Sequence, residues 1–327
     1  MYKRFYNLKR NPFEITPDPS FLYTSRMHNE ALATLYHGVR RRKGFVVLTG
    51  EVGTGKTLLV RCLLQILQRA NVAFAYVFNP RLSPTEFLQY IAGDLGLVTT
   101  NKSKSELLLA LSSYVIARHQ KGLTTVLVVD EAHLVSADVL EEIRLLTNLE
   151  TTQEKLLQIL LIGQQELEEK LDSRELRQLK QRIALRSHLG PLDPSETRGY
   201  VDCRLRLAGN TSPAELFPQE TIAELHCQTR GFPRLINTVC ENALVLAYAA
   251  QSKCITPEIV REVAVEFRLN VLHSSLSTGV KPGEPSEVER AARVLLDLYH
   301  SLKSVREPGV SFRIPVGTGT REDEPYI

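Results

Sequence analysis

Between residues 25 and 192, apolar residues occur either in short unbroken runs or in repeats of three and four positions. The unbroken runs at 45–49, 72–78, 125–129 and 156–162 predict buried strands. The repeats predict helices at 25–43, 58–69, 84–95, 105–120 and 137–149, the first with Ser25 as its N-cap. Apolar strands that alternate with helices are typical of a parallel sheet covered on both faces, so the pattern predicts an α/β core.

After residue 192 the pattern predicts helices alone, at 194–208, 218–229, 233–250 and 257–270, several of which begin at a proline. The first 24 residues are rich in proline and aromatic side chains. Beyond residue 270 the chain is rich in glycine, proline, serine and charge, with one helix-like segment at 288–302. We therefore expect an N-terminal arm at 1–24, a core at 25–192, a small helical domain at 193–270 and a flexible tail at 271–327.

Composition narrows the class of protein only slightly. The 327 residues are 43% hydrophobic and 24% charged, and 40 basic against 37 acidic residues disfavour a dominant basic surface for nucleic acid or membrane. Five cysteines without a CxxC pair indicate reduced thiols. We see neither a signal peptide nor a run near the ~18 apolar residues of a spanning helix, so we expect a soluble, cytoplasmic protein.

The segment GEVGTGKT fits the phosphate-binding pattern GxxxxGK[ST] and stands between a predicted strand and a predicted helix. Its glycines allow backbone N–H groups to face an anion, and the helix N-terminus adds partial positive charge. Lys56 is predicted to reach the β- and γ-phosphates, and Thr57 to ligate Mg²⁺. The alternative is a glycine-rich turn without a ligand. The predicted nucleotide-binding residues here are Gly50, Glu51, Val52, Gly53, Thr54, Gly55, Lys56, Thr57 and Leu58.

Asp130 and Glu131 directly follow the predicted strand at 125–129, at the end where open α/β sheets bind ligands. Asp130 is predicted to hold Mg²⁺ through water, and Glu131 to orient and deprotonate the attacking water. An acidic pair at a helix N-terminus is the alternative, which the upstream phosphate-binding segment disfavours. Together the two motifs predict Mg²⁺-dependent hydrolysis of ATP to ADP and phosphate.

With these motifs the chain resembles the AAA+ ATPases over roughly residues 5–270, which implies a three-layer αβα P-loop core followed by a helical lid. The resemblance makes Gln164, in IGQQEL, a first γ-phosphate sensor, although an amide that caps the next turn is the alternative. It also makes Arg234, in GFPRLIN, a second sensor carried by the lid. A cation at a helix N-terminus is disfavoured by the helix dipole, so Arg234 indicates an anionic partner.

The same resemblance implies an arginine finger that acts on a neighbouring subunit of an oligomer. Arg182, in KQRIALR before a short strand, is the first candidate, and Arg177 and Arg186 are rivals. The alternative for all three is a solvated basic helix face.

Within that superfamily the chain resembles the general secretion pathway protein A family, through NPFEITPDP, the following Ser25 and His28, and the motifs VVDEAH, IGQQEL and GFPRLIN. The resemblance implies an arm over the adenine, with Pro12 and Phe13 as base contacts, unless the arm merely anchors the chain start. Family members that act directly in secretion carry a membrane span and a peptidoglycan-binding domain. Because we find neither, we expect a shorter cytoplasmic relative, as in exopolysaccharide and PEP-CTERM export loci.

Three functions remain open from the sequence. The first is an oligomeric ATPase that serves an envelope export system, held near the inner membrane by a protein partner. The second is a DNA-binding regulatory ATPase of the transposition type, with basic stretches at 40–43 and 174–186 and a salt-sensitive affinity for duplex. The third is a nucleotide-gated switch with little turnover, which the complete Asp130–Glu131 pair disfavours.

Overall fold

The computed structural model describes residues 2–79 and 81–269, so the tail with its predicted helix at 288–302 lies outside the described residues. The core is a five-stranded parallel sheet in the order β2-β3-β4-β1-β5. The strands are β1 (Phe45–Gly50), β2 (Ala73–Val77), β3 (Thr125–Val129), β4 (Leu157–Ile162) and β5 (Leu185–Leu189). Each predicted apolar run is a strand, and the predicted α/β fold with a parallel sheet is confirmed.

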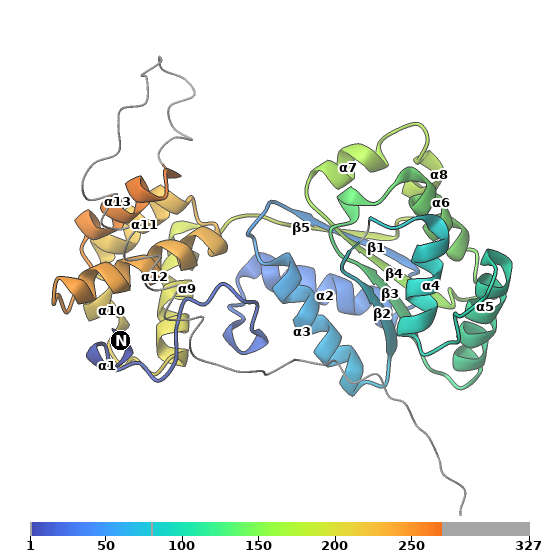
Figure 1. Cartoon of the computed structure of the whole chain (residues 1–327), viewed down its shortest axis with the longest axis horizontal. Helices are drawn as coiled ribbons and strands as arrows, with labels where there is room; N and C mark the ends of the chain where they lie inside the picture. Colours follow the sequence, from blue (N-terminus) through green and yellow to red (C-terminus); the bar gives the residue numbers. More distant parts are fainter. Residues whose placement is uncertain (1, 80, 270–327) are drawn as a thin grey trace, which may run out of the picture. The chain divides into compact units, whose positions relative to one another are not determined.

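Alternate residues of the central strands build two separate hydrophobic layers. Val46 and Leu48 of β1 face α2 and α3, whereas Phe45 and Val47 face the helices on the opposite side (Figure 1). This alternation is the period of a β-strand with both faces buried. The helices of the first layer are α2 (Arg26–Arg40) and α3 (Lys56–Arg69); those of the second are α4 (Pro84–Asp94), α5 (Lys104–Gln120), α6 (Ala137–Leu146), α7 (Glu166–Leu171) and α8 (Arg177–Lys180).

Capping residues determine where the helices begin more closely than the apolar pattern does. Ser103 caps α5, and Glu106 returns a hydrogen bond to the backbone of Ser103, so this helix begins at Lys104. Ser83 and Glu86 make the same capping box at the start of α4. These reciprocal bonds satisfy N–H groups that the first turn of a helix leaves without intrahelical partners.

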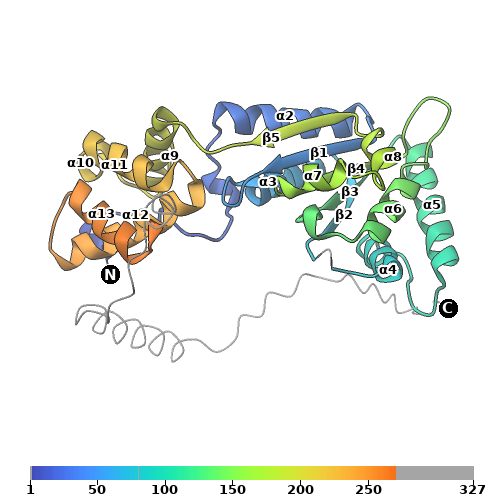
Figure 2. The same ribbon diagram turned by 90° about the horizontal axis from the view of Figure 1, so that it is seen from above.

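A second group of helices has a hydrophobic core of its own and contains no strand (Figure 2). It consists of α9 (Pro194–Leu207), α10 (Pro213–Leu216), α11 (Gln219–Thr229), α12 (Pro233–Ala249) and α13 (Pro257–Glu266). The N-terminal arm, with α1 (Tyr2–Phe5) and the 3₁₀ turn η1 (Pro19–Phe21), contributes Tyr2, Tyr6 and Phe13 to this same core. Among the described residues, no helix combines the length and apolarity needed to cross a membrane.

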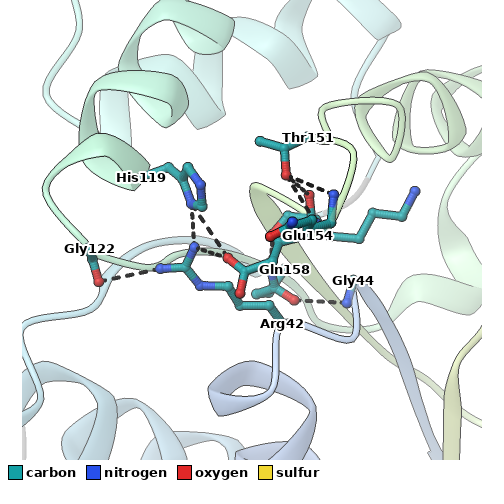
Figure 3. A network of polar contacts seen from close by, with 9 residues as sticks. Arg42, Gly44, His119, Gly122, Thr151, Glu154 and Gln158 are labelled. Carbon is teal, nitrogen blue, oxygen red and sulfur yellow. Dashed lines mark hydrogen bonds and ion pairs between the residues drawn. The ribbon is translucent and has the colours of Figure 1, made fainter.

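At the amino ends of the strands, one arginine links three connecting segments (Figure 3). Arg42 donates to Glu154 at 2.7 Å, to the Gly122 carbonyl at 3.3 Å and to Nδ1 of His119. Its side chain is only 15% exposed. The chain entering β1 is thereby tied to the loop before β3 and the turn before β4, on the side of the sheet away from the predicted site.

Candidate nucleotide-binding site

Residues 50–57, called the phosphate loop below, connect the end of β1 to the start of α3. Gly53 and Gly55 have φ of +85° and +97°, in the left-handed region that favours glycine. Gly55 is the N-cap of α3 and offers no side chain to its first N–H groups. The loop therefore presents main-chain N–H groups and a helix N-terminus in the arrangement that binds phosphate.

Lys56 lies inside this loop with 7% of its surface exposed. Its Nζ donates to the carbonyl oxygens of Gly50 at 2.7 Å and Glu51 at 2.8 Å. Burial lowers the pKa of Lys56, although the nearby carboxylates of Glu131 and Asp130 oppose this effect. The carbonyl oxygens and carboxylates around Nζ favour the charged ammonium form, which is the form that binds an anionic ligand.

Asp130 is the most enclosed carboxylate of the site, at 4% exposure. Its Oδ2 accepts hydrogen bonds from Thr57 Oγ1 at 3.2 Å and from the Tyr76 hydroxyl at 2.9 Å. Its Oδ1 accepts from the backbone N–H of Glu131 at 2.9 Å. A carboxylate beside a hydroxyl is the hard oxygen donor set that Mg²⁺ prefers, so Thr57 and Asp130 fit the predicted metal role.

Glu131 comes directly after β3 with φ of +51°, which turns its side chain out of the strand direction. Its carboxylate is 41% exposed and lies 3.5 Å from Nδ1 of His133 and 3.5 Å from Nε2 of Gln164. Gln164 follows β4, the strand between β3 and β1. The structure therefore brings the predicted base and the predicted first sensor together, with water access for the base.

The second group of helices, α9 to α13, is called the lid below. It meets the phosphate loop through the first turn of α12. The backbone N–H of Arg234 donates to the Gly53 carbonyl at 3.2 Å, while the Arg234 side chain is exposed. A Cβ on Gly53 would lie 2.9 Å from Cβ of Arg234, so this approach requires glycine. Arg234 thus lies beside the phosphate loop, and its role as second sensor stays a prediction.

The two predicted base contacts of the arm are both buried. Phe13 is fully covered, and its ring centre lies 6.0 Å from that of Phe217 in the core of the lid. This packing favours the alternative in which the arm anchors the chain start. A contact of Pro12 or Phe13 with adenine stays a prediction.

The three candidate finger arginines have different surroundings. Arg182 is half-buried and donates to Thr147 Oγ1 at 2.8 Å, so it supports the end of α6. Arg177 and Arg186 are exposed and line a cavity of about 580 Å³ with Arg174 and Lys180. Arg177 and Arg186 are thus accessible to other molecules, and the role of Arg182 or its two rivals as an arginine finger stays a prediction.

Three further residues of the site are absent from the sequence-based prediction. Tyr76 bonds to Asp130 from β2, His133 lies beside Glu131, and Nε2 of His28 lies 3.0 Å from the Thr54 carbonyl. His133 follows Glu131 by two positions, which was a usable signal. Tyr76 and His28 reach the site from 54 and 26 residues away along the chain. His28 belongs to the stretch that carries the family resemblance, but neither sequence position by itself indicates these contacts.

The parallel sheet, the phosphate loop, the Asp130–Glu131 pair and the helical lid define a P-loop ATPase of the AAA+ class. Comparison with known families agrees, because residues 39–171 match the AAA domain. The ORC2 protein of Aeropyrum pernix, solved in ADPNP and ADP complexes, superposes with a TM-score of 0.58 at 18% identity, over 79% of this chain and 72% of that one. The ORC1 protein of the same organism, solved in complex with DNA, gives 0.58 at 19% identity, over 92% and 84%.

A curated relative narrows the family. General secretion pathway protein A of Aeromonas hydrophila is 44% identical over 253 residues, which is 77% of this chain and 46% of that protein. The chain belongs to the AAA+ ATPases of the general secretion pathway protein A family. It spans about half the length of the curated relative that it matches.

Proposed function

We propose that this chain hydrolyses ATP to ADP and phosphate in a Mg²⁺-dependent reaction, as a cytoplasmic homo-oligomer that serves a secretion or exopolysaccharide export system. One juxtaposition carries the proposal: the exposed carboxylate of Glu131 lies within 3.5 Å of Gln164 Nε2, and its charge is near enough to Lys56 to oppose the burial that lowers the pKa of that lysine. A base, a polar sensor and a phosphate-binding cation thus converge at the carboxyl ends of three strands.

Each residue has a defined part in this reaction. Lys56 and the N–H groups of the phosphate loop bind the phosphates, and Thr57 with Asp130 would hold Mg²⁺, which supplies positive charge at the β- and γ-phosphates. Glu131 accepts a proton from the attacking water. Gln164 and Arg234 would contact the γ-phosphate.

The test of the chemistry compares two variants with the natural protein. Glu131→Gln removes the base and keeps the shape, so ATP should still bind while phosphate release falls roughly 100-fold or more. Lys56→Ala removes the buried cation and should abolish nucleotide binding. Calorimetric titration with ATP and a phosphate-release assay separate the two effects. Normal turnover by the Glu131→Gln variant would show that another group is the base.

The export role is supported by the curated relative alone, and that protein extends well beyond the shared region. If the chain serves an export system, we expect a protein partner to hold it at the inner membrane. Cell fractionation with and without a co-expressed export-system membrane protein tests it. We expect the chain in the membrane fraction only when that protein is present, and an unchanged distribution would count against the proposal.

A DNA-binding regulatory ATPase is the second candidate. The observation in its favour is the cavity lined by Arg174, Arg177, Lys180 and Arg186, in which four basic side chains surround one carboxylate, that of Asp172, which pairs with Lys180. Binding to duplex through such residues weakens steeply with salt. ATPase rates measured with and without duplex DNA, at low and at physiological salt, distinguish the two candidate functions. Stimulation by DNA that salt abolishes favours the DNA-binding regulator. An ATPase rate that does not respond to DNA favours the export role.

A further inference from the structure

The imidazole of His28 lies between the first turn of α2 and the phosphate loop. Its Nδ1 is 2.8 Å from Ser25 Oγ, and its Nε2 is 3.0 Å from the carbonyl oxygen of Thr54. His28 and Ser25 are only 5% and 3% exposed. Because Ser25 is the N-cap of α2, the ring connects a fixed helix end to the main chain of the phosphate loop.

The partners of the ring determine where its proton lies. A carbonyl oxygen only accepts, so Nε2 carries the proton and donates it to Thr54. Nδ1 then has a free lone pair, and the Ser25 hydroxyl donates to it. The ring is neutral in this arrangement. Burial lowers the pKa of His28, which favours the same neutral form.

This hydrogen bond determines the direction of one peptide group in the phosphate loop. The described backbone contains no cis peptide bond, so the C=O of Thr54 and the N–H of Gly55 lie in one plane and point in opposite directions. With the carbonyl directed at His28, the Gly55 N–H faces away from α2, into the loop. N–H groups on that side of a phosphate loop bind the anion.

The peptide needs such a restraint because glycine follows it. Gly55 has φ of +97°, and a glycine leaves its flanking peptides free to rotate. A Cβ at this position would lie 3.2 Å from Nε2 of His28, so a bulkier and stiffer residue would push against the ring. The restraint therefore comes from the histidine and not from the loop residue itself.

We propose that His28 is a positioning residue for nucleotide binding, which holds the Thr54–Gly55 peptide so that the Gly55 N–H meets the bound phosphates. This rests on the proposed ATP site. We expect this N–H to contact the phosphates both in the bound substrate and in the transition state, so that its contribution is to uniform binding. Loss of His28 should raise KM and leave kcat unchanged.

Two substitutions at one position test the proposal in the full chain. His28→Leu keeps the apolar volume and removes the donor, whereas His28→Gln keeps an N–H near the place of Nε2. Calorimetric titration uses ADP and inorganic pyrophosphate, both without Mg²⁺. We expect the leucine variant to bind both roughly tenfold more weakly, as for the loss of one hydrogen bond to a charged group, and the glutamine variant to recover most of the affinity.

The matched control is His226→Leu in the lid, where Nδ1 of His226 lies 2.9 Å from Thr197 Oγ1. It removes a comparable histidine–hydroxyl contact, and nucleotide affinity should stay unchanged. Circular dichroism at the titration temperature confirms that each variant is folded. The proposal is overturned if folded His28→Leu binds pyrophosphate like the natural protein, or if leucine and glutamine variants bind equally weakly. Failure of the natural protein to bind either ligand would instead refute the proposed ATP site.

Discussion

Gly231 shows how a single residue fixes the lid against the segment that follows β5. It has φ of +77°, and its carbonyl accepts a hydrogen bond from the N–H of Leu192 at 2.9 Å. A Cβ at this position would lie 2.0 Å from the Leu192 carbonyl oxygen, which is main chain and cannot move aside. The first residue of GFPRLIN is therefore glycine for two independent reasons.

Replacement of Gly231 by alanine should destabilise the protein more than a left-handed φ alone explains. Gly96 provides the control, because it has φ of +79° and open space around its Cβ position. We expect Gly96→Ala to cost about 1–2 kcal/mol and Gly231→Ala clearly more, since a backbone clash is added. Urea unfolding of both variants measures the difference. Equal losses would mean that the lid shifts to accommodate the methyl group.

Tyr76 permits a prediction about the metal. Its hydroxyl donates to the Asp130 oxygen that also accepts from Thr57, and so helps to orient the carboxylate. Tyr76→Phe should weaken the Mg²⁺-dependent gain in ATP affinity several-fold while Mg²⁺-free binding stays the same. Titration of ATP binding against Mg²⁺ concentration measures this. Tyr90→Phe serves as control, because Tyr90 lies in α4 and its ring packs against Phe78. An unchanged Mg²⁺ response in Tyr76→Phe would show that the hydroxyl does not have this role.

His28 also makes stability depend on pH. Burial holds its pKa below the ordinary value of 6.5, while the Thr54 carbonyl and Glu196 oppose this only partly. As the pH falls below 6.5, the unfolded chain takes up a proton that the folded chain does not, so the free energy of unfolding decreases, by at most about 1.4 kcal/mol per pH unit. Urea unfolding at pH 7.5 and 5.5 should show a smaller decrease for His28→Gln than for the natural protein. Identical decreases would assign the pH dependence to other groups.

At the scale of elements, the apolar pattern was sufficient for four of the five strands and for the long helices, whereas β5, with the sequence LRSHL, is too polar to form an apolar run. The strand at Thr125–Val129 is buried at every position, so its five apolar or β-branched residues are a clear signal. Short helices could not be predicted from the sequence. Helix α8 has four residues, fewer than two turns, and is too short to show the helical repeat of apolar positions. The phosphate loop was predictable because its residues are contiguous, whereas Tyr76 reaches Asp130 and His28 reaches the phosphate loop only through folding.

The network around Arg42 should contribute stability without affecting the nucleotide. Arg42→Ala removes the contacts with Glu154, His119 and the Gly122 carbonyl, and we expect a loss of about 1–3 kcal/mol. Because these contacts lie at the amino ends of the strands, ADP affinity should stay the same. Arg41→Ala, at an exposed neighbouring position, should change stability by less than about 0.5 kcal/mol. A loss of ADP affinity in Arg42→Ala would reveal coupling across the sheet.

At the scale of the whole molecule, catalysis should depend on contact between copies. Specific ATPase activity should rise with protein concentration if an arginine of one copy completes the site of another. Arg177 and Arg186 are exposed and Arg182 is half-buried, so all three are tested, and removal of such a finger would cost ~10³–10⁵ in rate.

Mixing two inactive variants tests this directly. Lys56→Ala keeps the finger but lacks a working site, and Arg186→Ala has the converse defect. An equimolar mixture should be more active than either variant alone. At a mixed interface, the intact nucleotide site of the Arg186→Ala copy can meet the intact arginine of the Lys56→Ala copy. Arg177→Ala and Arg182→Ala are mixed in the same way to identify the residue, and Arg206→Ala, exposed on the lid, should be active without mixing. Purely additive rates in every mixture would exclude a finger in trans.

The position of Arg186 has a consequence for solubility as well. Strand β5 pairs only with β1 among the described strands, so its outer edge is available for pairing with another chain. Arg186 and His188 are exposed on this five-residue strand, and charged side chains on short edge strands discourage aggregation. The arginine that would reach into a neighbouring copy therefore also prevents copies from joining edge to edge, which favours regulated assembly over fibre formation.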